Sequence, residues 1–183
     1  MIVLVWGGKY LRAIDVFNGQ ELWVEEFDRI FSDMVASLVS DEECLYLAEK
    51  NRTTAVVLSR CAIGDEVIRW TTSGGSGNVS SPVLINGLLI SVTDSGIVSY
   101  LDATSGRRLK RIRLKGQFFA PLVANALYVY LTNMRGITTV LSCDRTLETI
   151  SQNDLCDDIY AAIAATNDCL FIRTFDSLYC IAK

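Results

Sequence analysis

The segment Ser81–Leu114 reads SPVLINGLLISVTDSGIVSYLDATSGRRLKRIRL, and it decides the predicted fold. Tight-turn signals divide this segment into four short, largely apolar stretches. Asn86-Gly87 is a strong two-residue hairpin signal, because both residues tolerate the positive φ of a type I′ turn. Asp94–Gly96 and Asp102–Gly106 mark the next two turns. The segment therefore predicts a meander of four antiparallel strands.

The same order of strands and turns recurs along the chain. Four apolar runs that follow a small residue or proline open the copies: Ala36–Val39, Ser81–Leu84 with Pro82, Ala120–Val123 with Pro121, and Ala161–Ala164. Their starts lie 45, 39 and 41 residues apart. Four strands in a repeat of this length are typical of a β-propeller blade, a sheet that must stack on neighbours to bury both faces. A β-sandwich of evenly spaced strands is the alternative, but it does not require the period.

We therefore expect an all-β protein, a β-propeller of four-stranded antiparallel blades. One domain would span residues 1–183, with repeat units at about 1–33, 34–78, 79–117, 118–158 and 159–183. If the strands of a blade are labelled A to D from the channel outwards, the chain reads BCD, ABCD, ABCD, ABCD, ABC. About four to five blades result, either as an incomplete arc of a larger propeller or as a five-bladed ring with two imperfect blades.

The repeat resembles that of the pyrroloquinoline-quinone (PQQ) propeller family. The family pattern runs S-P-V, a glycine turn, V-Y-V, then A-L-D-A-x-T-G and a tryptophan. Ser81–Ser91 is similar to its first half, and Ala13–Trp23 is similar to its second half. Ile63–Trp70 is a looser copy, whereas Ser142–Ile150 lacks both the glycine and the tryptophan. Leu178–Ala182 resembles the family's L-Y-A-L-D strand, so the resemblance spans the chain.

The resemblance carries implications for structure and for function. Family tryptophans dock between blades, which assigns that role to Trp23 and Trp70. The repeat positions are Trp23, Trp70, Gly19, Gly106, Asn86, Gly87, Pro82 and Pro121. The family's enzymes are eight-bladed quinoprotein dehydrogenases, whose cofactor lies beside Ca²⁺ and a Cys-Cys disulfide; this sequence has no Cys-Cys dipeptide. Other members are binding platforms, such as a lipoprotein of bacterial outer-membrane barrel assembly.

Composition excludes several classes of function. The sequence contains no histidine, which removes Ser-His-Asp triads, Cys-His dyads and histidine metal ligands. A net charge of −4 argues against general nucleic-acid binding. The six cysteines form no Cys-x-x-Cys pair, and we expect buried free thiols. Repeat alignment places Cys44, Leu88, Leu127 and Cys169 at equivalent, inward-facing positions.

Two features are candidates for a partner surface. Arg107, Arg108, Lys110, Arg111, Arg113 and Lys115 form the only basic run, which fits an outermost strand or a site for an acidic protein. In one regular strand, Arg108 and Lys110 would lie opposite the other four. Trp6 is outside the repeat frame and would be exposed to a partner.

For two further segments, the sequence favours a structural role over a binding role. The acidic group Asp154, Asp157 and Asp158 has no calcium-loop spacing, so a solvated loop between blades is expected. Gly74–Asn78 precedes a strand rather than a helix, so a mobile connection between blades is expected rather than a phosphate site.

The sequence thus predicts a non-catalytic propeller that binds a protein partner or a second copy of itself, with no cofactor, metal or nucleic acid. The alternative is a fragment of a PQQ-dependent quinoprotein oxidoreductase. No run reaches the roughly 18 apolar residues of a membrane helix. The N-terminal apolar run is too short for a signal peptide, which favours the cytoplasm unless the chain is a fragment of an exported parent.

Overall fold

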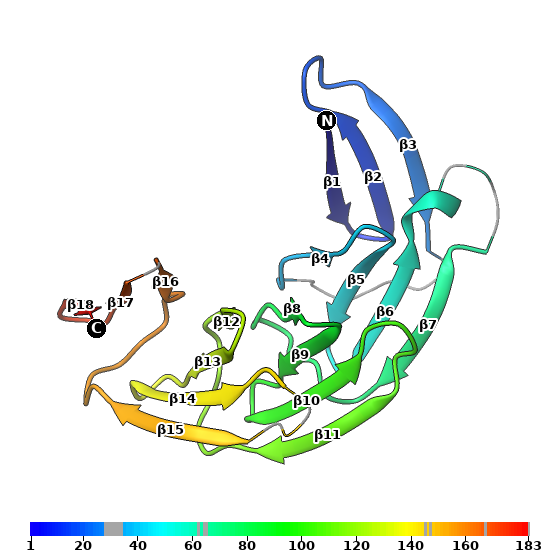
Figure 1. Cartoon of the computed structure of the whole chain (residues 1–183). Helices are drawn as coiled ribbons and strands as arrows, with labels where there is room; N and C mark the ends of the chain where they lie inside the picture. Colours follow the sequence, from blue (N-terminus) through cyan, green and yellow to red (C-terminus); the bar gives the residue numbers. More distant parts are fainter. Residues whose placement is uncertain are drawn as a thin grey trace.

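The turns predicted from the sequence divide the chain into five antiparallel sheets, which we call blades 1 to 5 (Figure 1). The computed structural model describes residues 1–27, 35–61, 63, 66–144, 146, 148–166 and 168–182. Blade 1 contains β1 (Ile2–Gly7), β2 (Tyr10–Asp15) and β3 (Glu21–Glu26). Blade 2 contains β4 (Val39–Ser40), β5 (Cys44–Glu49), β6 (Arg52–Val57) and β7 (Ile68–Ser73), with a short 3₁₀ turn at Leu58–Arg60.

The remaining blades repeat the same meander. Blade 3 contains β8 (Val83–Ile85), β9 (Leu88–Val92), β10 (Ile97–Asp102) and β11 (Arg108–Arg113). Blade 4 contains β12 (Val123–Ala124), β13 (Tyr128–Thr132), β14 (Ile137–Ser142) and β15 (Thr149–Asp154). Blade 5 contains β16 (Ala164–Ala165), β17 (Cys169–Arg173) and β18 (Leu178–Ala182). The predicted order BCD, ABCD, ABCD, ABCD, ABC is therefore confirmed within the described residues.

Backbone conformation explains the tight turns. Asn86 and Gly87 have φ values of 51° and 71°, the left-handed pair that a type I′ hairpin requires. Gly19 and Gly106, with φ values of 72° and 69°, end the same turn in blades 1 and 3. In each turn the glycine N–H donates to the carbonyl of the aspartate four residues earlier, Asp15 or Asp102.

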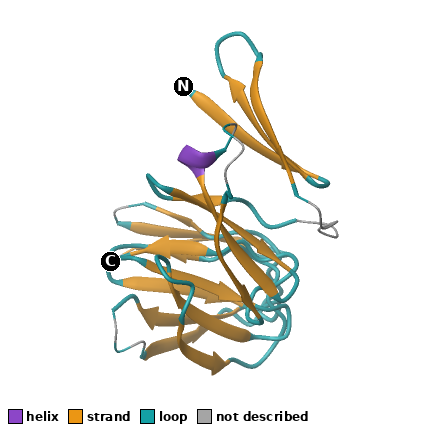
Figure 2. Cartoon of the chain, turned by 90° about the vertical axis from the view of Figure 1, so that its right-hand side faces the viewer, coloured by secondary structure: helices purple, strands orange, loops and turns teal. Residues whose placement is uncertain are grey.

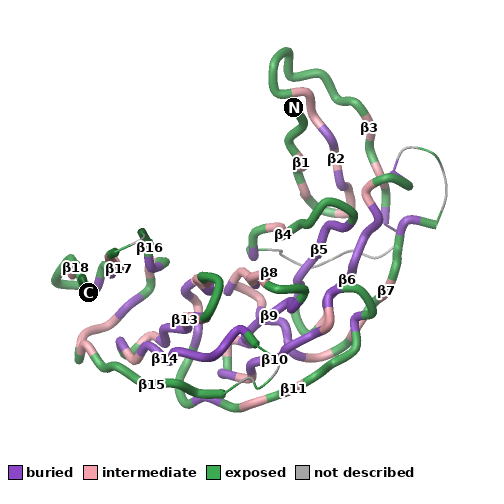
Figure 3. The backbone as a smooth tube through the Cα atoms, in the orientation of Figure 1, coloured by how far each residue is buried: buried purple, intermediate pink, exposed green. Residues whose placement is uncertain are grey.

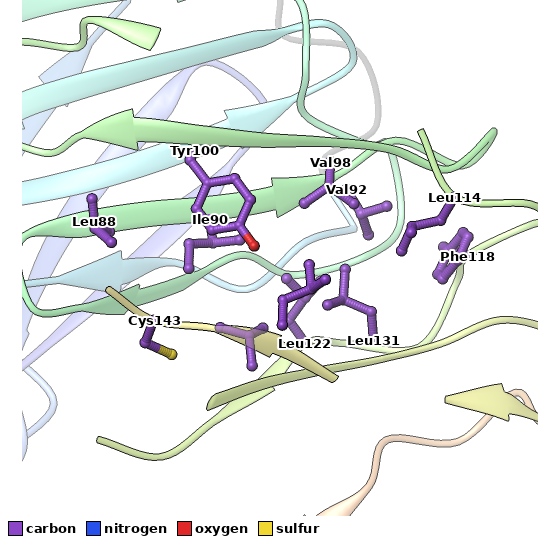
Figure 4. Close-up of a cluster of buried hydrophobic side chains, with 12 residues drawn as sticks. Leu88, Ile90, Val92, Val98, Tyr100, Leu114, Phe118, Leu122, Leu131 and Cys143 are labelled. Carbon is purple, nitrogen blue, oxygen red and sulfur yellow. The ribbon is translucent and has the colours of Figure 1, made fainter. Parts of the chain in front are cut away.

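Each pair of neighbouring blades encloses its own apolar core. The largest core lies between blades 3 and 4, where Ile90 and Tyr100 pack against Leu131 and Cys143 (Figure 4). Separate clusters lie between blades 1 and 2, 2 and 3, and 4 and 5. A single blade cannot bury both faces, so these joints between blades hold the fold together.

The five sheets follow one another around an open arc, with blades 1 and 5 at its two ends (Figure 1). In the view turned by 90°, blade 1 projects beyond the rest at one end (Figure 2). Of the two architectures that the sequence allowed, the structure has the arc rather than the five-bladed ring. Among the described residues, no helix is long and apolar enough to cross a membrane.

Pairing of the A and B strands corrects the predicted alignment of blade 4. Val39, Val83 and Val123 pair with Tyr46, Ile90 and Tyr130, so Tyr128 rather than Leu127 is equivalent to Cys44 and Leu88. The side chain of Leu127 is accordingly 65% exposed. Pro82 and Pro121 likewise differ by one position, since Pro82 directly precedes its strand and Pro121 does not.

Cysteine burial follows from which blade faces are covered. Cys44, Cys61 and Cys143 are buried free thiols, as expected, but Cys156 and Cys180 are exposed. Cys169 is only partly buried. It shares a face of blade 5 with Phe171, whereas the neighbouring residues Leu170 and Ile172 pack toward blade 4. No described residue of a following blade covers the Cys169 face, so the predicted inward position of Cys169 is wrong.

Candidate functional site

A β-bulge at the same place in blades 1 to 4 organises the outer strands. The bulged residues are Leu22, Arg69, Leu109 and Ile150. Each adds one residue to the outer strand, which reverses the face of every residue beyond it. The residues that follow the bulge occupy equivalent positions: Trp23, Trp70, Lys110 and Ser151. A side chain of sufficient length at this position can reach the next blade.

Trp70 shows what this position does when it holds an aromatic residue. Its indole N–H donates to the carbonyl of Ala103 in the C–D turn of blade 3, at 3.0 Å. The Tyr46 hydroxyl lies 3.3 Å from the same carbonyl and donates to Asp41 at 2.7 Å. A Cβ atom on Gly106 would lie 2.5 Å from the Trp70 ring, so only glycine allows the ring to pack there. Trp70 therefore joins blade 2 to blade 3.

Trp23 is partly buried against the apolar cluster between blades 1 and 2. It belongs to the joint that precedes the Trp70 joint.

Two residues of the basic run also join blades. Lys110 stands at the tryptophan position, and its ammonium group donates to the Thr146 carbonyl of blade 4 at 3.1 Å. Arg108 donates to the carbonyls of Ser73 and Gly74, both at 2.5 Å, at the end of blade 2. These two side chains therefore hold blade 3 to its neighbours on both sides.

The bulge at Leu109 corrects the predicted arrangement of the basic run. Arg108 pairs with Leu101 and Lys110 with Tyr100, so they lie on opposite faces of the sheet. Arg108 instead shares its face with Arg111 and Arg113, which pair with Ser99 and Ile97. The expectation that Arg108 and Lys110 lie together was wrong because a bulge breaks strand alternation.

Three arginines remain on the outside of blade 3. Arg107, Arg111 and Arg113 are exposed, in or beside an outermost strand. Within the part of the chain that the structure describes, their guanidinium groups form no ion pair. Of the three, Arg113 lines a hollow together with Asp94, Lys115 and Gln117. We call Arg107, Arg111 and Arg113 the basic rim.

The prediction that Trp6 is exposed to a partner is wrong. Its ring lies 5.1 Å from that of Phe27 and packs against the cluster between blades 1 and 2. Leu4 and Trp6 alternate with Val3 and Val5 along β1, and the two valines lie on the opposite face. Val3 and Val5, which are exposed, therefore lie on the face of β1 opposite Trp6.

The remaining candidate segments have structural roles or no assigned chemistry. In the Gly-rich connection, a Cβ on Gly75 would lie 2.0 Å from the Ser99 hydroxyl, and the Ser76 hydroxyl donates to the Arg52 carbonyl at 2.7 Å. The connection is thus buried and packed rather than loose. Asp158 pairs with Arg135 at 3.4 Å. Among the described residues, no group of three or more acidic or cysteine side chains is arranged to hold a metal.

The stacked four-stranded meanders define this chain as an arc of a β-propeller. It is similar to the crystal structure of BamB from Moraxella catarrhalis, with a TM-score of 0.73, 14% identity, and coverage of 97% of this chain and 52% of BamB. It is also similar to the computationally designed Ika8 protein, with a TM-score of 0.73, 12% identity, and coverage of 99% and 57%. The chain therefore spans little more than half of either structure. No protein-family model matches the sequence, and no curated protein does so either.

Proposed function

We propose that this chain is a non-catalytic propeller module that binds an acidic protein surface through the basic rim, Arg107, Arg111 and Arg113. One observation carries the proposal: in a protein of net charge −4, Arg111 and Arg113 are exposed on one face of the outer strand β11, and Arg107 is exposed just before that strand. Arg108 and Lys110 bond to neighbouring blades, whereas the rim arginines have no ion-pair partner in the described structure.

The chemistry of the basic rim supports binding of carboxylates. Guanidinium groups are planar donors that suit carboxylates, and they remain charged at any physiological pH. Because the chain carries a net charge of −4, an acidic partner is repelled on average and is attracted near such a local patch. The PQQ-type assignment of the repeats rests on the sequence motifs alone, and a role in protein interaction agrees with the binding-platform members of that family.

Binding of a short fluorescein-labelled oligoglutamate peptide, followed by fluorescence anisotropy, tests the proposal. Arg111→Ala/Arg113→Ala is expected to weaken binding at least about fivefold, which corresponds to roughly 1 kcal/mol. The control Lys50→Ala/Arg173→Ala removes the same charge from exposed positions on other blades and leaves affinity nearly unchanged. Equal losses of affinity in both variants would mean that net charge alone explains the binding, which would contradict the proposal.

The quinoprotein alternative makes a separate prediction. Incubation with PQQ and Ca²⁺ followed by gel filtration is expected to leave no quinone absorbance with the protein. Retention of the cofactor would replace the non-catalytic assignment.

A further inference from the structure

The face of blade 1 that points away from blade 2 is apolar and uncovered. Val3 pairs with Ile14, and Val5 pairs with Arg12, which in turn pairs with Val24. The side chains of Val3, Val5 and Val24 are 47%, 40% and 42% exposed. Figure 3 shows the exposure of β1 and β3 at this end of the arc. We call this surface the blade 1 end face.

In blade 3, the equivalent positions are covered by the preceding blade, so their exposure can be compared with that in blade 1. Strand register makes Val3, Ile14 and Val16 of blade 1 equivalent to Leu89, Leu101 and Ala103 of blade 3. The blade 3 residues are only 0%, 1% and 3% exposed. They are buried because Cys44, Tyr46 and Ala55 of blade 2 pack on them. All three positions are apolar in blade 1 as well, but Val16 is 40% exposed.

The turn that receives the docking tryptophan is also present in blade 1. The Val16 N–H donates to the Met1 carbonyl, as the Ala103 N–H donates to the Gly87 carbonyl. Gly19 has the same left-handed conformation as Gly106. A Cβ on Gly106 would strike Trp70, whereas a Cβ on Gly19 would meet nothing within 4 Å. Among the described residues, no donor reaches the Val16 carbonyl, the counterpart of the one that Trp70 and Tyr46 share.

Charged residues also lie on this face, and Arg12 stands between Val5 and Val24 in the strand pairing. Arg12 forms an ion pair with Glu21, and Lys9 forms one with Glu26. The Arg12 guanidinium lies 5.1 Å from the centre of the Tyr10 ring. The Arg12 charge is thus held by neighbours within blade 1, and Val3, Ile14 and Val16 form the apolar part of the face.

We propose that the blade 1 end face is the docking surface for a propeller blade from outside these 183 residues, which inserts an aromatic N–H donor between Gly19 and the Val16 carbonyl. The occupant is a four-stranded sheet with tryptophan after the bulge of its outer strand, as in blade 2. This inference is independent of the basic rim and stands or falls separately from the proposed function.

A second copy of the chain does not supply this donor. Trp23 and Trp70 are already packed in joints within their own copy. The equivalent positions of blades 3 and 4 hold Lys110 and Ser151. In the described residues, blade 5 has no outer strand, and its open face carries Phe171 and Arg173 rather than an indole.

A duplicated blade tests the docking surface. Because Gly87 is equivalent to Met1, a copy of residues 35–87 that replaces Met1 enters β1 in register and presents a second Trp70 to Gly19. We expect this extension to raise the urea midpoint of the full chain and to shield the added indole from a quencher. The matched control carries alanine in place of the added tryptophan.

Gly19→Ala separates docking from general stabilisation. In the extended chain the new methyl group meets the added indole, so the loss of stability should be at least about twice that in the unextended chain. Equal losses, or an added tryptophan that stays accessible to quencher, would overturn the proposal. If the extension prevents folding, the double variant Val3→Asp/Val5→Asp of the unextended chain tests whether the blade 1 end face is open. An unchanged urea midpoint with reduced binding of a hydrophobic dye supports an open docking face, and a large fall in midpoint or unchanged dye binding refutes it.

Light scattering of the unextended chain at micromolar concentration addresses the competing occupant. A monomer is expected. A dimer that Val3→Asp dissociates would assign the face to a second copy and overturn the proposal.

Discussion

Alanine at Gly106 should destabilise the chain far more than alanine at Gly19, although both glycines end the same turn. Their φ values, 69° and 72°, impose nearly the same strain on any residue with a Cβ. Their surroundings differ, because a Cβ on Gly106 would lie 2.5 Å from Trp70 and one on Gly19 would have no neighbour within 4 Å. The pair of substitutions therefore isolates the contribution of tryptophan docking.

The expected magnitudes follow from these contacts. The left-handed conformation costs an alanine roughly 1 kcal/mol at either site. At Gly106 the Trp70 ring must also move away, which breaks its 3.0 Å hydrogen bond to the Ala103 carbonyl. That bond contributes about 1 kcal/mol, and lost packing of the ring adds a similar amount. We expect a loss of about 1 kcal/mol for Gly19→Ala and about 3 kcal/mol for Gly106→Ala.

Urea unfolding followed by far-UV circular dichroism measures both values, and Trp fluorescence reports on the docked ring. Trp70→Phe supplies an internal check, since removal of the indole should shrink the penalty of Gly106→Ala. Equal destabilisation by the two alanine substitutions would refute the assigned role of Trp70 as the residue that joins blades 2 and 3.

Three other outcomes are expected. Cys44→Ser should cost about 1–3 kcal/mol by burying a hydroxyl without a matching partner, whereas Leu127→Ala should change stability by less than about 0.5 kcal/mol in the same urea titration. A thiol reagent should label the exposed Cys156 quickly and the buried Cys44 only in denaturant, because burial both blocks access and raises the pKa of the Cys44 thiol. Hydrogen bonds from the Ser105 hydroxyl and N–H lower the pKa of Asp102, so its stabilising contribution is present above its unfolded pKa of about 3.9 and is lost as pH falls through the lower folded value. Asp102→Asn should therefore flatten the dependence of unfolding free energy on pH below about 4, and an unchanged slope would contradict this.

The blade meander could be predicted because its signals are local. The Asn86-Gly87 turn and the aspartate-to-glycine turns before Gly19 and Gly106 depend on the conformations of a few adjacent residues. The period of the repeat then gave the strand order of all five blades. Each of these features can be seen without knowing what packs against the strand.

Features that depend on neighbouring strands could not be predicted. The bulge at Leu109 places Arg108 and Lys110 on opposite faces of the sheet. No residue type in the strand indicates that a bulge occurs there. The alignment of blade 4 was wrong by one residue because Leu127 and Tyr128 are both apolar enough to fit the inward position. Only the pairing of β13 with β12 distinguishes the two registers. Exposure of Trp6 was misjudged since its burial depends on Phe27, which lies beyond the end of the blade 1 meander.

The residue type at the position after the bulge differs from blade to blade, and this affects how each blade contacts the next. This position holds an aromatic residue in blades 1 and 2, a cation in blade 3 and the small polar Ser151 in blade 4. An indole buries area and donates one hydrogen bond, a lysine supplies a hydrogen bond with little burial, and a serine cannot reach the next blade. The outer strand of blade 4 is accordingly exposed along its whole length, from Thr149 to Asp154. The tryptophan joints thus lie between blades 1 and 2 and between blades 2 and 3, toward the same end of the arc where Gly19 and the exposed valines would accept one more blade.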